Sequence, residues 1–101
     1  MSNIKSINLR ELQQATNRLF DHIIKTRGVE SIELRQNFYW STPTEQFYDV
    51  KNDPKQLDVG SLYDDWEFVQ SLTRDETEPV AFQLTEVAPL LRYIGEVVKE
   101  T

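Results

Sequence analysis

The clearest pattern in the chain is a run of apolar residues at helical spacing near its start. The positions concerned are Leu9, Leu12, Thr16, Leu19, Phe20, Ile23 and Ile24. Asn8 stands where an N-cap residue belongs, and Glu11 follows three residues later, which is the signature of a capping box. Gly28 comes after the last periodic residue, as a helix C-cap glycine does. We therefore predict a helix over residues 9–27.

Residues 29–38 follow a different period. Ile32 and Leu34 fall on one side and charged residues on the other, which predicts a half-buried strand. Three consecutive aromatic residues, Phe38-Tyr39-Trp40, then break the alternation. Two interpretations stay open, a single strand with a bulge or two strands joined by a turn at 36–37. We favour the hairpin-like pair.

Turn-forming residues dominate the stretch from Pro43 to Gly60. Asn52 and Asp53 before Pro54 form a turn signal. A structureless loop of this length is uncommon in a compact domain and is often functional when present. We expect a long loop here, interrupted by one helical turn around 44–47.

A second long helix is predicted over 61–73, with Ser61 as its N-cap. Its apolar stripe is Leu62, Trp66, Val69 and then Leu72 or Thr73. The position of Trp66 on this stripe predicts that its indole belongs to the core.

The last part of the chain begins with a short β-compatible run, residues 80–84, which we interpret as a strand. Thr85 can cap a final helix that starts at Glu86, and Pro89 then falls in the first turn, where its missing amide hydrogen is harmless. The buried face of this helix is predicted to be Leu90, Leu91, Ile94, Val97 and Val98.

Together these elements predict an α+β fold in which three helices pack around a small sheet of two or three short strands. The length of 101 residues corresponds to a single domain, 1–101, with a loose terminus over residues 1–6.

The charge of the chain is negative and unevenly distributed, with a formal net charge of −6. Residues 45–78 hold ten acidic residues against three basic ones. Such a field opposes nucleic acids and anionic membranes as partners, because Lys and Arg drive both kinds of binding. The acidity keeps a small protein soluble, and it would also steer a basic partner.

Other function classes are excluded by what the sequence lacks. There is no cysteine, hence no disulfide, thiolate metal site or thiol nucleophile. The first residues do not resemble a signal peptide, and no apolar run has the length of a membrane span. We therefore expect a cytoplasmic protein.

Candidate catalytic and metal-binding groups do not form a recognisable site. His22 is the single histidine and lies between core positions of the first helix. Asp64 and Asp65 are neighbours in a helix, point about 100° apart and suit the helix N-terminus. No glycine-rich phosphate loop exists. We predict no catalytic residue, no metal site and no cofactor.

The stretch 37–50 holds five of the eleven aromatic residues. Large aromatics dominate both cores and interfaces, and the sequence leaves open which role applies. If the stretch forms an interface, the candidate interaction residues are Tyr39, Trp40, Glu45, Tyr48, Asp49 and Asp53.

Three short motifs carry a family resemblance. They are Phe38-Tyr39-Trp40 with Pro43 and Tyr48, Gly60-Ser61-Leu62 with Asp64-Asp65-Trp66, and Leu90-Leu91-Arg92-Tyr93-Ile94-Gly95. In these motifs the chain resembles a group of small uncharacterised bacterial proteins, a domain of unknown function. The resemblance implies a bacterial cytosolic domain and transfers no activity or site residue.

The leading hypothesis is a non-enzymatic protein-interaction module that binds a protein with a basic or mixed surface. An immunity protein or antitoxin that blocks a basic toxin is one specific version. The alternative is a small-molecule binder or enzyme with an aromatic pocket between loop 37–50 and helix 61–73, lined by Tyr39, Trp40, Tyr48, Tyr63 and Trp66. Both a monomer and a weak homodimer remain open.

Overall fold

A computed structural model describes residues 5–74 and 78–99 of the chain. Within these ranges it contains four α-helices and one two-stranded antiparallel sheet, which confirms the predicted α+β class. The chain divides into two compact units, residues 1–32 and residues 33–101. Residues 1–4 of the predicted loose terminus lie outside the described residues.

The first unit contains helix α1, Leu9–Arg27, with the predicted bounds and caps. The Asn8 side chain accepts a hydrogen bond from the backbone N–H of Glu11 at 2.9 Å. Gly28 adopts a left-handed conformation with φ of 64°, and its N–H donates to the carbonyl of Ile24. Local sequence therefore sufficed to place both ends of α1.

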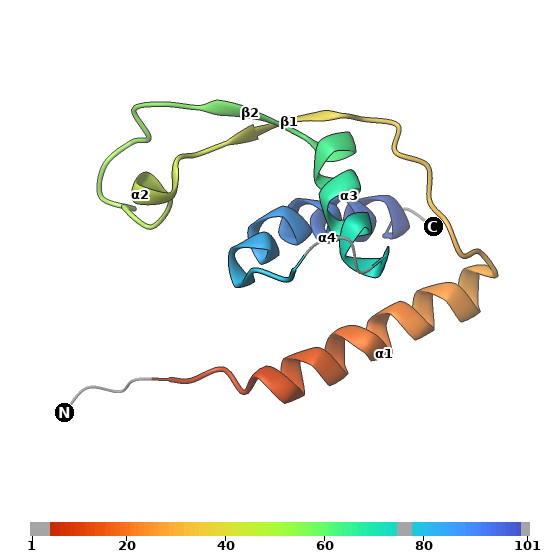
Figure 1. The fold of residues 1–101 in the computed structure, drawn as a ribbon. Coiled ribbons are helices and arrows are strands. Elements are labelled where there is room, and N and C mark those ends of the chain that lie inside the picture. Colours follow the sequence, from red (N-terminus) through yellow and green to blue (C-terminus); the bar gives the residue numbers. More distant parts are fainter. Residues whose placement is uncertain (1–4, 75–77, 100–101) are drawn as a thin grey trace. The chain divides into compact units, whose positions relative to one another are not determined.

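The second unit holds the remaining elements (Figure 1). In chain order they are β1 (Phe38–Ser41), α2 (Thr44–Phe47), β2 (Asp58–Ser61), α3 (Leu62–Ser71), the 3-10 turns η1 (Leu72–Arg74) and η2 (Ala81–Gln83), and α4 (Leu84–Val98). The strands form an antiparallel ribbon, and the connection between them carries α2 at the end away from α3 (Figure 1). The predicted helical turn around 44–47 is confirmed.

The strand predicted before the aromatic run is not formed, because residues 31–37 have no partner strand. Side chains satisfy their backbone instead. The Tyr93 hydroxyl donates to the carbonyl of Glu33 at 2.8 Å and accepts from the N–H of Arg35 at 2.9 Å. The Tyr63 hydroxyl donates to the carbonyl of Leu34 at 3.3 Å. The alternation itself was informative, since Leu34 is half-buried between two exposed charged residues.

The predicted hairpin-like pair at 36–37 is also wrong, because β1 pairs with β2 across a long connection. Phe38 lies opposite Ser61, Tyr39 opposite Gly60, and Trp40 opposite Val59. The sequence around Gly60 reads as a turn because glycine is depleted in strands. A glycine inside a strand also permits close approach of another group, and here Tyr39 lies against it.

The strand predicted over 80–84 is a 3-10 turn followed by the start of α4 at Leu84. The Gln83 side chain accepts from the N–H of Val80 at 2.9 Å, and the N–H of Gln83 donates to the Val80 carbonyl at 2.8 Å. The expected cap at Thr85 is likewise wrong, because its hydroxyl donates to the carbonyl of Phe82 from inside the helix. These local bonds replace strand pairing.

The core of the second unit lies where α3 packs on α4. Leu62 and Leu90 are buried, at 4% and 8% exposure. Trp66 is 45% exposed, so its prediction as a core residue is wrong. The buried stripe of α3 passes through Asp65 instead. A carboxylate needs a partner to be buried, and for Asp65 that partner comes from β1.

Candidate interaction surface

The register of β1 and β2 sorts the aromatic run onto two faces. Phe38 and Trp40 share one face with Val59, the residue opposite Trp40. Their exposed fractions are 71%, 74% and 60%. We call these three residues the outer face. It is an apolar surface on a sheet of only two strands.

The inner face holds Tyr39 and Gly60. The Tyr39 hydroxyl donates to Asp65 Oδ2 at 2.6 Å, a short hydrogen bond that joins β1 to α3. A Cβ atom at position 60 would overlap the far end of the Tyr39 ring. The absence of a side chain at Gly60 therefore gives the ring the space to reach Asp65.

Electrostatics at the inner face favour the neutral phenol. Burial, the hydrogen bond to Asp65 and the negative charges of Asp65 and Glu86 raise the pKa of the Tyr39 hydroxyl above its ordinary value. Glu86 also contributes an oxygen, Oε2, that is buried without a hydrogen-bond partner among the described residues. The inner face is thus a polar contact between β1 and α3, and the Glu86 carboxylate on α4 acts on Tyr39 electrostatically.

The other predicted interaction residues lie on the connection between the strands. Tyr48 is 83% exposed, and the side chains of Glu45, Asp49 and Asp53 are exposed too. The rings of Phe47 and Tyr48 pack edge to face, with centroids 5.0 Å apart. The structure therefore separates Tyr39 from the exposed members of the predicted set.

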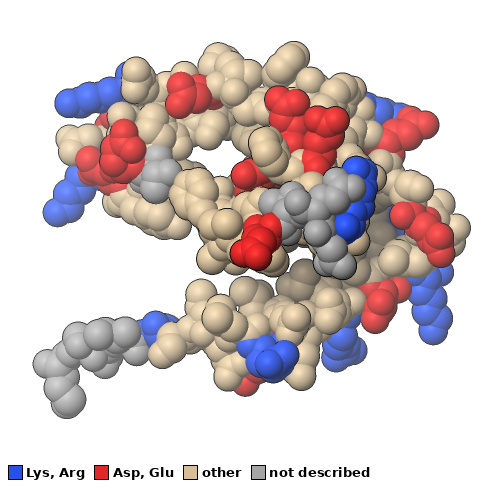
Figure 2. Space-filling view, viewed as in Figure 1, with Lys and Arg blue, Asp and Glu red and all other residues tan. Residues whose placement is uncertain are grey.

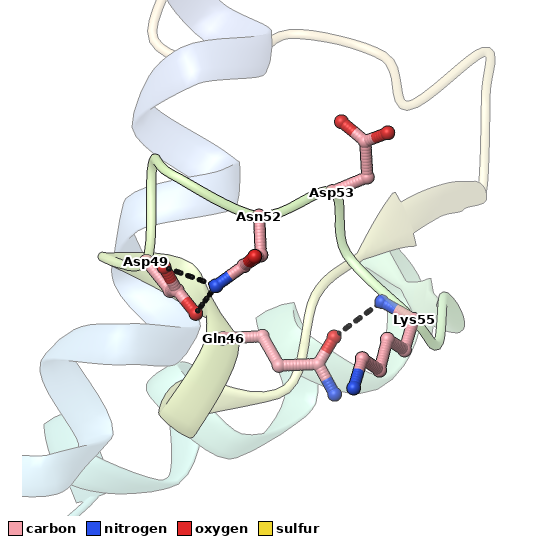
Figure 3. A pocket seen from close by; sticks show the side chains of 5 residues that line it. All are labelled: Gln46, Asp49, Asn52, Asp53 and Lys55. Carbon is pink, nitrogen blue, oxygen red and sulfur yellow. Dashed lines mark hydrogen bonds between the residues drawn. The ribbon is translucent and has the colours of Figure 1, made fainter.

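The same connection forms a small polar hollow of about 230 Å³, lined by Gln46, Asp49, Asn52, Asp53 and Lys55 (Figure 3). The Asn52 amide donates to both carboxylate oxygens of Asp49, at 3.1 and 3.3 Å. The backbone N–H of Lys55 donates to Gln46 Oε1 at 2.7 Å. These bonds give the loop its shape, and the Asp53 carboxylate points away from them (Figure 3).

The pocket of the alternative hypothesis requires aromatic walls. None of its five expected residues lines this hollow. Tyr63 instead donates a hydrogen bond to the carbonyl of Leu34 at 3.3 Å, and Tyr39 is engaged by Asp65. Across residues 5–74 and 78–99, no group of three or more His, Cys, Asp and Glu side chains could hold a metal ion. No helix in those ranges has the length and hydropathy of a membrane span.

Charge on the second unit is strongly unbalanced, because residues 33–101 hold 14 acidic and six basic residues. Acidic side chains are visible at several places on the surface of this unit, separated by uncharged areas (Figure 2). The second unit therefore combines an exposed apolar face with a net negative charge.

Sequence reasoning missed Phe38 and Val59 as members of the surface. The signal for Phe38 was available, since residues i and i+2 of a strand share a face, so the exposure of Trp40 implies that of Phe38. No such signal existed for Val59, because its place beside Trp40 depends on the pairing of β1 with β2.

A scan against protein-family models, a search of curated proteins and a search of solved structures each found no match.

Proposed function

We propose that this chain is a small acidic protein-interaction module. It binds a protein with a basic or mixed surface through the outer face, Phe38, Trp40 and Val59, with the acidic connection between the strands as the rim. The observation that supports this most is the exposure of Trp40 at 74% beside Phe38 at 71%. Tryptophan is the residue type most enriched among interface hot spots.

The aromatic rings of the outer face would be more stable against a partner than in water. An exposed apolar face on a two-stranded sheet leaves large aromatic area in contact with water, and burial against a partner would gain roughly 25 cal/mol for each Å² removed from water. Acidic side chains at Glu45, Asp49 and Asp53 would accelerate association with a basic partner. A bacterial cytoplasmic binder of immunity-protein or antitoxin type is the specific form of this proposal.

The same charge argues against a nucleic-acid partner, because no neutralising set of Lys and Arg accompanies the aromatic rings. A gel shift with duplex DNA and with RNA at physiological salt tests this point. Submicromolar binding in that assay would contradict the proposal.

The main experiment is affinity capture from the native host followed by measurement on the purified partner. Trp40→Ala should weaken binding by about 30-fold or more, as expected when a hot-spot residue is removed. The matched control is Phe82→Ala, since Phe82 is similarly exposed, at 65%, on η2 and lies outside the outer face. It should leave the affinity within about threefold.

Charge reversal supplies a second readout. Asp49→Lys or Asp53→Lys should slow association and reduce its salt dependence, while dissociation changes little. A partner that binds Trp40→Ala as tightly as the wild type, with association unaffected by salt, would contradict the proposal.

A further inference from the structure

The first unit presents a second apolar surface that the proposed function does not use. Helix α1 is the one regular element described in residues 5–32, and none of its residues is buried. Leu9, Leu12 and Leu19 are 78%, 53% and 63% exposed. An isolated 19-residue helix is marginal in water, and amphipathic helices owe most of their stability to packing.

The spacing along α1 is that of a coiled-coil seam. Leu9, Leu12, Thr16, Leu19, Ile23 and Thr26 follow one another at alternating intervals of three and four residues. These are the a and d positions of a heptad, which face a partner helix. Phe20 and Ile24 widen the apolar stripe on one side.

The two threonines on this seam can be buried without losing a hydrogen bond. The Thr16 hydroxyl donates to the carbonyl of Leu12 and the Thr26 hydroxyl to that of His22, each at 2.7 Å. With these hydroxyls satisfied inside the helix, burial of either side chain would leave no hydrogen-bonding group unpaired. The seam therefore tolerates an apolar partner along its length.

The charges of α1 indicate what that partner is. Arg10, Glu11, Arg18, Asp21 and Lys25 all fall on the side of the helix opposite the seam. The positions that flank a coiled-coil seam set the choice of partner, and here they are uncharged apart from Arg27 in the last turn. A helix shaped for a strongly charged surface would carry complementary charges there, whereas an uncharged flank lets an identical helix approach without repulsion.

We propose that α1 is a dimerisation helix that packs antiparallel against α1 of a second copy of this chain. In this register Leu12 lies opposite Ile23 of the second copy, Thr16 opposite Leu19 and Leu9 opposite Thr26. Every threonine then faces a leucine. A parallel pair would place Thr16 against Thr16 and Thr26 against Thr26, so two of the six layers would contain no large apolar side chain. The seam from Leu9 to Thr26 is about 26 Å long at 1.5 Å per residue.

Sedimentation equilibrium of the full chain over a range of concentrations tests the association. The wild type should change reversibly from monomer to dimer as concentration rises. Leu19→Glu should raise the dissociation constant by more than about 100-fold, because both copies would place a charge in the seam. The matched control, Gln14→Glu, adds the same side chain on the charged side and should leave the dissociation constant within about threefold.

The direction of packing is tested by disulfide trapping, which the absence of native cysteine makes clean. Mixed Leu12→Cys and Ile23→Cys chains should cross-link to each other in preference to themselves. A chain with Arg18→Cys, on the charged side, controls for random collision. Preferential linkage of position 12 to position 12 would overturn the antiparallel register.

Two further outcomes would overturn the proposal as a whole. One is a wild-type chain that stays monomeric at all accessible concentrations. The other is a dimer that Leu19→Glu does not weaken, since self-association would then use another surface. Trp40→Ala should leave the dimer intact, so failure of this inference and failure of the proposed function can be distinguished.

Discussion

The two faces of the β1–β2 ribbon use neighbouring aromatic residues in opposite ways. On the inner face the Tyr39 ring occupies the space left by Gly60, and its hydroxyl reaches Asp65 on α3. On the outer face Phe38 and Trp40 remain largely exposed. The difference shows that an aromatic cluster in a sequence is not one functional unit, because strand geometry assigns alternate rings to structure and to surface.

This comparison predicts that substitutions on the inner side lower the free energy of unfolding, while those on the outer face lower partner affinity. The largest loss of stability is expected in the core between α3 and α4. Leu62→Ala should lower the free energy of unfolding by about 2–5 kcal/mol, the range for buried leucine truncations, because Leu62 is 4% exposed. Trp66→Ala, one turn along the same helix, should lower it by less than half as much. Urea melts followed by circular dichroism measure both, and a larger loss for Trp66→Ala would place the core elsewhere.

The next effect concerns the space beneath Tyr39. Gly60→Ala should lower the free energy of unfolding by about 1–3 kcal/mol, since the new methyl group overlaps the ring and displaces it. Gly95→Ala is the matched control, because nothing lies within 4 Å of its added Cβ. In the last turn of α4 it should be neutral or stabilise by up to ~1 kcal/mol. In a Tyr39→Leu background the Gly60→Ala loss should shrink, and an unchanged loss would contradict the contact.

A somewhat smaller effect should follow from removing one hydroxyl. Tyr39→Phe leaves Asp65 without its tyrosine donor and should lower the free energy of unfolding by about 1–2 kcal/mol near neutral pH. The loss should depend on pH, because the pKa of the Tyr39 hydroxyl is raised in the folded state. Folding favours the neutral phenol, so this stabilisation is complete below the unfolded pKa near 10 and is lost as pH rises through the folded pKa.

The comparison of wild type with Tyr39→Phe isolates that dependence, since the other titrating groups are common to both proteins. The difference between their unfolding free energies should therefore stay constant from pH 7 to 9 and become smaller above about pH 10. A gap that changes between pH 7 and 9 would point to a different titrating group.

The smallest effect on stability is expected on the outer face. Trp40→Ala should change the free energy of unfolding by less than about 1 kcal/mol, because an exposed side chain has little packing to lose. Tyr39→Ala, its neighbour in the chain, should cost clearly more. Equal losses for the two variants would remove the distinction between the faces.

Local signals predicted the parts of the fold that local interactions stabilise. The ends of α1 follow from Asn8 and Gly28, whose bonds lie within one turn of each end. The start of α3 follows from Ser61, whose side chain accepts from the N–H of Asp64 at 3.3 Å. The caps of α1 depend on no distant residue, so local sequence was sufficient there. The start of α3 is also stabilised by Asn37, whose side chain accepts from the Ser61 hydroxyl at 2.8 Å and from the N–H of Tyr63 at 2.9 Å. For α3 the local signal identified the N-cap residue but not this second support.

Predictions failed where a distant residue supplied the decisive contact. Residues 31–37 alternate like a strand, yet Tyr63 and Tyr93 satisfy part of their backbone, and the partner of β1 lies 17 or more residues further on in the chain. Asp65 lies in the first turn of α3 as expected, but it is also buried there, whereas Trp66, which was assigned to the core, is 45% exposed. A pattern of hydrophobicity cannot show that a carboxylate will meet a tyrosine hydroxyl from another element.

For this protein the sequence alone determined the α+β class, both caps of α1, the N-cap residue of α3, the acidic charge and the spacing of apolar residues along α1. Those properties depend on residue types at fixed spacing. The tertiary structure decided which aromatic rings became surface, because pairing Tyr39 with Gly60 directs one ring inward to Asp65 and turns Phe38 and Trp40 outward. That choice depends on register between two strands, which adjacent residues do not encode.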